Sequence, residues 1–187
     1  MKAALVGIVA ITSIAAADGI HLHAEVDPLP FIRAGYGAQI GVRDDDHVGR
    51  VRVAIASFSL DVPDFAAQLG GNDDFHIRVR PSVAAYVLYY LSPKRNGFAI
   101  GGSLRYLRLR YTHDAVDGEH DNVSEISPEA IVAYKWHPTG LGFYVQPWFG
   151  LSATVSRSHD PVVGDRAYDP LPLQAFFTVN LGWELVR

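Results

Sequence analysis

The sequence contains no cysteine and few charged residues. None of its 187 residues is Cys, which excludes disulfide frameworks, thiolate zinc sites and a cysteine nucleophile. Charged residues form 19% of the chain, against about 25% in average proteins, while hydrophobic residues form 49%. This composition excludes a disordered linker or tail, and it raises the question of what covers so much apolar surface.

Positive charge is also sparse. The chain has 16 Lys and Arg against 20 Asp and Glu, a net charge of -4. The basic residues are scattered, so no basic stripe is available to neutralise a phosphate backbone. Nucleic acid is therefore not an expected partner.

One long apolar run is present, at the start of the chain. Met1 and Lys2 precede an apolar stretch that reaches Ala17, which is typical of a secretory signal. A membrane anchor or a buried helix is the alternative, but a spanning helix needs about 20 residues. We predict a cleavable signal peptide over 1–17 and a single domain over 18–187. No later run reaches eighteen apolar residues, so no transmembrane helix is expected.

The rest of the chain alternates between apolar and other residues with a period of two, which indicates half-exposed strands. Eight runs follow this pattern: 20–26, 36–43, 50–60, 75–91, 98–111, 124–136, 143–155 and 173–185. The run 75–91 reads as one strand in a single register. The only competing feature is a possible turn over 65–69.

The links between these runs alternate in length. The links at 44–49, 92–97 and 137–142 are short, whereas 28–35, 61–74, 112–122 and 157–170 are longer. Short turns at one end and long loops at the other are typical of outer-membrane barrels with an even strand number. The predicted fold class is an all-β, eight-stranded, antiparallel up-and-down transmembrane β-barrel.

The alternation alone allows the apolar face to point into lipid or into a ligand cavity of a soluble barrel. The other face carries charges of both signs in mid-strand, which suits a narrow lumen with paired charges. Aromatic residues near the strand ends suit interfacial girdles. We therefore expect the apolar face to meet lipid, with a soluble periplasmic barrel that binds an apolar ligand as the alternative.

The mid-strand charges are the main candidate site. We predict a lumen charge network of Arg78, Arg80, Arg105, Glu125, Glu129, Lys135 and Glu184. An ion path is one interpretation of these residues. Eight strands leave an interior that side chains can fill, so we favour a packed network of cross-strand salt bridges and expect no conducting pore.

Four stretches carry a resemblance to known proteins: HLHAEVDPL, SLDVPDF, GGNDDFHIRVR and GFYVQPWFGL. With them, the chain resembles small bacterial outer-membrane barrels of the OmpA/OmpX type and a group of uncharacterised exported barrels. The resemblance implies a monomer in the bacterial outer membrane, with membrane lipid, lipopolysaccharide and the assembly machinery as partners. Such barrels commonly end in an aromatic residue, whereas this chain ends in Arg187, which weakens the expected insertion signal.

The run 98–111 contains a second candidate site. Its lipid-facing parity, set by Leu104 and Tyr106, next reaches Arg108 and Arg110. Either these two arginines contact lipopolysaccharide phosphates, or a bulge near Tyr106 turns 107, 109 and 111 toward lipid. Uninterrupted pairing would favour the phosphate contact.

No catalytic residue, metal site or cofactor is predicted. His21 and His23 share a strand face, but no third metal ligand follows at a fixed spacing. Lipid A deacylases are barrel enzymes that carry His and Ser two residues apart on a strand, and neither His113 nor His159 matches that spacing. A lipid A-modifying enzyme is therefore the minority hypothesis beside a structural or surface-interaction role.

The long loops are acidic. Of the 20 acidic residues, 11 lie in 61–74, 112–122 and 157–170, beside only Arg157 and Arg166. Solvated loops are the simpler interpretation. Clustered carboxylates are also hard oxygen ligands, so bridging of divalent cations is the functional hypothesis for them.

Overall fold

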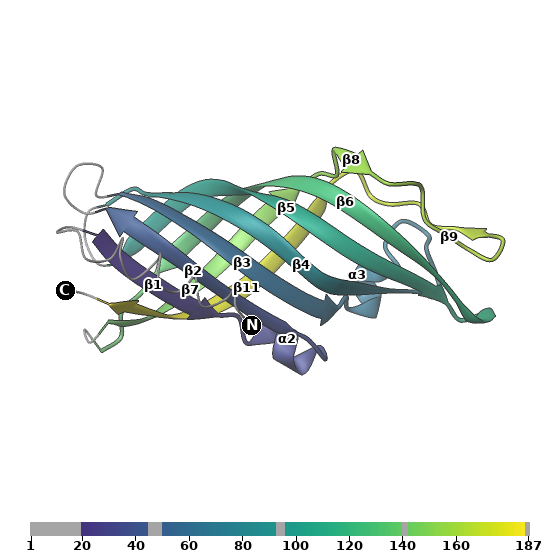
Figure 1. Ribbon diagram of the computed structural model, residues 1–187, viewed down its shortest axis with the longest axis horizontal. Helices are drawn as coiled ribbons and strands as arrows, with labels where there is room; N and C mark the ends of the chain where they lie inside the picture. The colour runs from purple at the N-terminus through teal and green to yellow at the C-terminus, as the bar shows by residue number, and fades with distance from the viewer. Residues whose placement is uncertain (1–19, 45–49, 93–95, 140–141, 186–187) are drawn as a thin grey trace, which may run out of the picture.

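The computed structural model describes residues 20–44, 50–92, 96–139 and 142–185. They form a closed barrel of antiparallel strands (Figure 1). The barrel strands are β1 (Ile20–Val26), β2 (Tyr36–Asp44), β3 (Val51–Asp61), β4 (Phe75–Tyr90), β5 (Gly97–His113), β6 (Val116–Lys135), β7 (Phe143–Ser152) and β11 (Gln174–Leu185). The predicted signal peptide over 1–17 lies outside the described residues.

Each barrel strand pairs with its neighbours in the chain, and the pairing of the first strand with the last closes the sheet. β1 pairs with β11, and β5 pairs with β6, so the strand order β5-β4-β3-β2-β1-β11-β7-β6 has no open edge. Closure removes the unpaired edge groups that would otherwise be exposed. The predicted eight-stranded, antiparallel, all-β barrel is confirmed.

The remaining elements are short and lie in the loops. They are α2 (Leu29–Ile32), α3 (Asp64–Ala67), β8 (Ser156–Arg157), β9 (Val162–Val163) and β10 (Arg166–Ala167). The turn expected over 65–69 corresponds to the single turn of α3. Across the part of the chain that the structure describes, no helix has the length and apolarity needed to cross a membrane.

The strands present their apolar residues outward. Ile55 and Phe177 on the outer surface are 60% and 61% exposed, whereas Lys135 and Gln146 in the interior are fully buried. The reason is the period of two, which places alternate side chains on opposite faces of each strand. The predicted orientation, with apolar residues outside and charges inside, is confirmed for the central part of the barrel.

One strand departs from the prediction. The register of β4 against β5 shifts between Arg80 and Val83, so 75–90 is not a strand with a single phase. An extra residue in a strand moves all following side chains to the other face. Phe75 and Val79 are consequently buried inside the barrel, at 4% and 8% exposure, and Arg78 lies outside.

Ser82 holds this bulge in place. Its Oγ accepts a hydrogen bond from the backbone N–H of Arg108 at 2.9 Å and donates to the carbonyl of Arg80 at 2.8 Å. Pro81 has no N–H that would need a ladder partner. Ser82 and Pro81 therefore support the bulge. The alternation of apolar residues along the run does not reveal it.

The polar segment 112–122 is a strand hairpin, not the long loop that we expected. Tyr111 pairs with Asp121 and His113 with Val116, so β5 and β6 continue past the apolar part of the barrel. Backbone pairing needs no apolar side chains where strands leave the lipid. The segment lacks alternation for this reason, and the sequence pattern did not reveal it.

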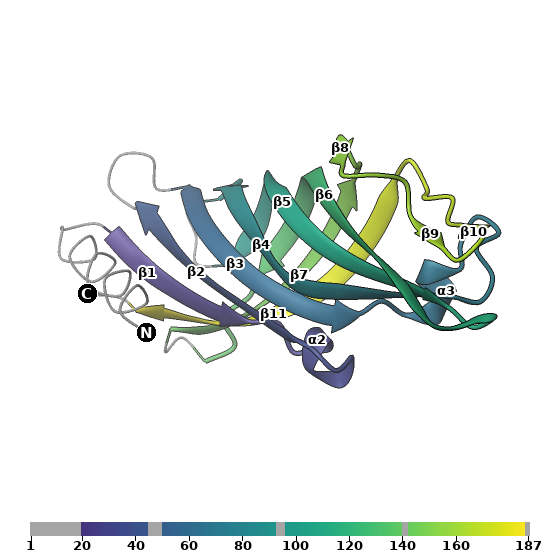
Figure 2. The same ribbon diagram turned by 45° about the vertical axis from the view of Figure 1, so that its right-hand side comes forward.

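At the outer mouth of the barrel, the end that carries the longer links, the loop after β7 packs on the link between β3 and β4. Figure 2 shows β9, β10 and α3 together at one end of the barrel. Tyr168 donates a hydrogen bond to the Ala67 carbonyl at 3.1 Å, and Asn72 bonds the backbone of Asp169 in both directions. Beneath them lies an apolar core of Phe75, Val79, Leu107, Leu109, Tyr111, Val123, Val163 and Tyr168.

Candidate functional site

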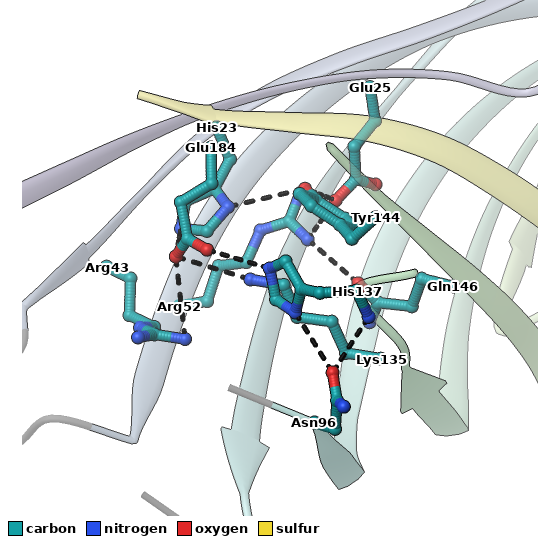
Figure 3. A network of polar contacts seen from close by, with 10 residues as sticks. All are labelled: His23, Glu25, Arg43, Arg52, Asn96, Lys135, His137, Tyr144, Gln146 and Glu184. Atoms are coloured by element: carbon teal, nitrogen blue, oxygen red, sulfur yellow. Dashed lines mark hydrogen bonds and ion pairs between the residues drawn. The ribbon is translucent and has the colours of Figure 1, made fainter. Parts of the chain in front are cut away.

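The interior of the barrel holds a buried polar cluster near the end where β1 begins, drawn in Figure 3. Side chains from six barrel strands and two adjoining links contribute to it. We call this cluster the inner lumen network; it consists of His23, Glu25, Arg43, Arg52, Asn96, Lys135, His137, Tyr144, Gln146 and Glu184. All of them are buried except Asn96, which is exposed.

Glu184 on β11 is the first centre of this network. Its carboxylate lies 3.3 Å from Lys135 Nζ, 3.0 Å from His137 Nε2, 3.5 Å from His23 Nε2 and 3.7 Å from Arg43 Nη1. The Glu184 and Lys135 side chains are 2% and 0% exposed. Buried charges are stable only when paired and hydrogen-bonded, and this carboxylate provides the pairing.

Glu25 on β1 is the second centre. It forms an ion pair with Arg52 and accepts hydrogen bonds from Tyr144 and Gln39. Arg52 also donates to Gln146 Oε1 at 3.4 Å. The ammonium group of Lys135 lies 4.3 Å from the ring centre of Tyr144, a cation–π contact that joins the two centres.

A glycine makes room for Tyr144 between these charges. Gly182 lies directly opposite Tyr144 in the β7–β11 ladder. A Cβ at position 182 would lie 2.2 Å from Tyr144 Cζ, far closer than atoms can pack. The absence of a side chain at Gly182 is what allows the ring to lie across the lumen.

Buried side chains form several further groups in the lumen. A buried apolar cluster adjoins the inner lumen network, because the ring of its Tyr90 lies 5.5 Å from Arg43 Cζ and 5.6 Å from Lys135 Nζ. The cluster consists of Leu88, Tyr90, Ala99, Ile131, Ala133 and Trp148. Two ion pairs form another group: Arg105 Nη1 lies 3.1 Å from Glu129, and Arg157 Nε lies 2.7 Å from Glu125. The apolar core at the outer mouth is a further group. The geometry of eight strands leaves an interior that side chains can fill.

The structure places five of the seven predicted lumen residues in the interior. Buried or nearly buried there are Arg105, Glu125, Glu129, Lys135 and Glu184. Arg78 and Arg80 do not belong to this set, and their assignment to the lumen was wrong. The bulge at Ser82 reverses their face, so Arg78 bonds Asp61 at 2.9 Å and Arg80 bonds Asn122 at 3.3 Å on the outer surface.

Of the inner lumen network, the predicted lumen charges included Lys135 and Glu184. Arg43 and Arg52 occupy the polar face of their runs and lie directly opposite each other in the β2–β3 ladder. Their parity was a usable signal. Arg157, which lies in the lumen outside this network, had no such signal in the sequence. It follows β7 in a polar segment and reaches Glu125 only through the β6–β8 pairing.

The outer wall carries the second candidate site. The pairing of β5 with β6 is continuous from Gly97 to Tyr111, and the extra residue lies on β4. Arg108 and Arg110 consequently point outward, whereas Leu107, Leu109 and Tyr111 are buried inside. The alternative in which these three residues meet lipid is wrong.

A Ser–His–Asp arrangement lies at the rim of the outer mouth. Ser158 Oγ lies 3.1 Å from His159 Nδ1, and His159 Nε2 lies 2.9 Å from Asp121. A neutral imidazole that donates from Nε2 to the carboxylate accepts at Nδ1, so Ser158 donates to it. Asp121 also accepts the N–H of Val162 at 3.0 Å, which attaches β9 to β6.

The acidic loop residues are dispersed among such contacts. Asp61 bonds Arg78, while Asp64 and Asp114 lie 3.2 and 3.0 Å from the two ring nitrogens of His76. Within residues 20–44, 50–92, 96–139 and 142–185, no group of three or more His, Asp or Glu forms a site for a metal ion. Bridging of divalent cations between these loops and lipopolysaccharide stays a prediction.

Comparison with known proteins places the fold. No known protein family and no curated protein matches the sequence. Neisserial surface protein A is 10% identical, covers 90% of this chain and 97% of its own, and aligns with a TM-score of 0.50. A major outer membrane protein from Thermus thermophilus is 12% identical, with 89% and 98% coverage and a TM-score of 0.55. The chain has the fold of small eight-stranded outer-membrane barrels, which confirms the expected resemblance at the level of fold.

Proposed function

We propose that this protein is a monomeric barrel of the bacterial outer membrane, without an open pore, that has a structural or surface-interaction role. The observation that carries the proposal is the combination of an apolar outer face with a lumen filled by paired charges. A soluble protein would gain nothing from exposing Ile55, Val87, Leu104 and Phe177 at 52–61%, whereas lipid would cover them.

The aromatic side chains support this location. Phe98 packs against Tyr134 at 4.9 Å between ring centres, and Phe143 lies 6.3 Å from Trp183. Both pairs lie near the short links, and Tyr36 and Tyr106 occupy the outer surface near the opposite end. Aromatic residues at both margins of an apolar band are typical of membrane barrels.

The outer loops support a surface role. α3, β9 and β10 pack on one another through Tyr168 and Asn72, so they present a defined surface. Such ordered loops on a rigid scaffold are where binding residues commonly lie.

Reconstitution into a planar lipid bilayer tests the sealed lumen. The full mature chain, folded in detergent, should migrate differently on gels before and after heating and should give no stepwise conductance. A general porin in the same bilayer serves as the positive control. Stepwise conductance would contradict the sealed lumen, and purification as a stable soluble protein without detergent would contradict the membrane location.

A hydrolase is the second candidate, because Ser158, His159 and Asp121 have the contacts of an activated nucleophile. Ser158 Oγ also accepts the N–H of Ser124 at 3.1 Å, and Asp121 bonds Val162, so the three residues join β6, β8 and β9. We expect this structural role alone, with no release of acyl chains from lipid A or from a short-chain ester. Turnover that is lost in both Ser158→Ala and His159→Ala would support the enzyme instead.

A further inference from the structure

The outward side of β2–β5 has features that the sealed lumen does not explain. We propose that this wall binds a phosphorylated, acylated lipid of the outer leaflet, with arginines holding the phosphates and an apolar hollow holding part of an acyl chain. The proposal rests on the membrane location proposed above. It extends that function by naming a lipid class and a binding site.

Four arginines face each other across one ladder. Arg78 lies directly opposite Arg110, and Arg80 lies directly opposite Arg108, in the pairing of β4 with β5. The bulge at Ser82 is what brings the two β4 arginines to the same side as those of β5. Like charges directly opposite on a sheet are destabilising, so an anion between them would stabilise this wall.

The protein itself supplies little negative charge to these arginines. Arg78 has a carboxylate partner, Asp61, at 2.9 Å. Arg80 and Arg110 share a neutral acceptor, Asn122 Oδ1, at 3.3 and 3.4 Å. Among the described residues, the guanidinium of Arg108 has no hydrogen bond or ion pair. Three of the four guanidiniums are therefore available for bidentate contacts to phosphate oxygens.

A hollow with charged and apolar lining residues lies beside the outermost arginines. It has a volume of about 500 Å³ and is lined by Arg33, Arg78 and Arg110, together with Asp61, Asp64 and His76. The Asp64 carboxylate is hydrogen-bonded to His76, as is the carboxylate of Asp114 in the turn between β5 and β6. With Arg80 and Arg108 nearby, the wall has five arginines against three aspartates, so its net charge favours an anionic headgroup.

An apolar hollow lies on the same outer surface, between the arginines and the middle of the barrel wall. It has a volume of about 700 Å³, and its lining includes Ala38, Ile55, Ser57, Ala85, Leu104 and Tyr106. The small side chains of Ala38, Ser57 and Ala85 make the depression, because larger residues surround them. The pair Val83–Tyr106 follows the pair Arg80–Arg108 along the ladder, so the two hollows are adjacent.

The order of these features matches an anionic lipid. Phosphates would lie at the arginines, just beyond Tyr106, and an acyl chain would lie against the apolar hollow within the membrane. A free phosphate would use the arginines alone and would leave the apolar hollow empty. The hollow commits the proposal to an acylated ligand.

Binding to nanodiscs provides the test. The folded mature chain is placed in phosphatidylcholine nanodiscs doped with bisphosphorylated lipid A or with its dephosphorylated form, and lipid retained after mild detergent extraction is measured by native mass spectrometry. We expect the phosphorylated lipid to be retained about tenfold more strongly, and inorganic phosphate at equal concentration not to displace it.

Matched variants separate the two parts of the site. The double variant Arg80→Gln with Arg108→Gln should lose the preference for the phosphorylated lipid. Arg50→Gln with Arg166→Gln removes the same charge elsewhere, at the other end of the wall and in the β10 loop, and should keep it. Ala85→Phe leaves the charge unchanged and fills the apolar hollow, so it should weaken retention of both lipids.

Three results would overturn the proposal: equal retention of the two lipids, equal loss in the two double variants, or full displacement by inorganic phosphate. In each case, an intact heat-modifiable barrel without conductance would leave the proposed function standing. Failure to insert into lipid at all would instead contradict the proposed function.

Discussion

At the residue scale, one buried carboxylate of the lumen, that of Glu184, faces several cationic groups at once. Glu184 contacts Lys135, Arg43 and two histidines, and it is almost completely buried. Such a carboxylate contributes to the stability of the fold mainly because, without it, the buried cations would be left unpaired. The net attraction of the ion pairs contributes less. Removal of the carboxylate should therefore be costly even when the shape of the side chain is kept.

We expect Glu184→Gln to lower the free energy of unfolding by about 3–5 kcal/mol, as for other broken buried ion pairs. Urea unfolding of the detergent-folded protein measures this change. Glu119→Gln, at an exposed position of the β5–β6 hairpin, removes the same charge and should change stability by less than about 0.5 kcal/mol. Similar losses in both variants would contradict a role of Glu184 as a centre of the network.

His76 lies near the outer end of β4, and its two ring nitrogens contact Asp64 and Asp114. Burial acts to lower the pKa of His76, but hydrogen bonds and charge from Asp64 and Asp114 outweigh it, so the pKa is raised above the usual 6.5. The stabilisation is complete below the unfolded pKa and is lost as pH rises through the folded pKa. An NMR titration should find a raised pKa for His76 and a lower one in Asp114→Asn. An unchanged pKa in that variant would contradict the pairing.

At the element scale, the loop after β7 covers the outer apolar core and is attached to β6, and we call it the cap. Asp121 bonds His159 and the N–H of Val162, and Val163 and Tyr168 are buried in the outer apolar core. Burial acts to raise the pKa of Asp121, and the hydrogen bonds from Val162 and His159 outweigh it, so the pKa is lowered. This stabilisation is present above the unfolded pKa and is lost as pH falls through the lowered value.

We expect Asp121→Ala to speed amide exchange in 162–168 at neutral pH, because β9 loses its attachment to β6. Hydrogen exchange with mass spectrometry measures this change. Asp117→Ala, at an exposed position near the hairpin turn, is the matched control and should leave the segment protected. Unchanged exchange in Asp121→Ala would indicate that the apolar contacts of Val163 and Tyr168 hold the cap without it.

At the scale of the whole molecule, the contact between the first and last strands closes the barrel. Val26 on β1 lies opposite Leu181 on β11, and both face outward. Directly paired residues in antiparallel strands have Cα atoms about 4.5–5.5 Å apart, within the range of a disulfide. The chain has no cysteine of its own, so an introduced pair has no competitor.

The double variant Val26→Cys with Leu181→Cys should form a disulfide on oxidation and raise the temperature at which the folded band disappears from gels. Val26→Cys with Val179→Cys is offset by two residues, about 7–8 Å diagonally, and should cross-link poorly. Equal cross-linking in both variants would contradict the register of this seam.

Much of the fold was predictable from residues of alternating character. Runs such as 51–61 and 174–185 alternate because one face meets an apolar environment and the other a packed interior. The outer parts of β4, β5 and β6 were not predictable in this way. In those parts the interior is apolar and the exterior carries arginines. Phe75, Val79 and Leu109 face the interior there, although their alternation is the same as that of residues that face lipid.

By itself, the sequence determined the number of strands, their order along the chain and the face that points outward in the central barrel, because these follow from local periodicity and link length. Only the tertiary structure decided which charges meet. Ser82 turns Arg78 and Arg80 from the lumen to the outer wall, and the closure of β1 on β11 brings Glu184 close to Arg43, which is distant in the chain. Pairing across a closed barrel depends on register, and a single extra residue in one strand is enough to change it.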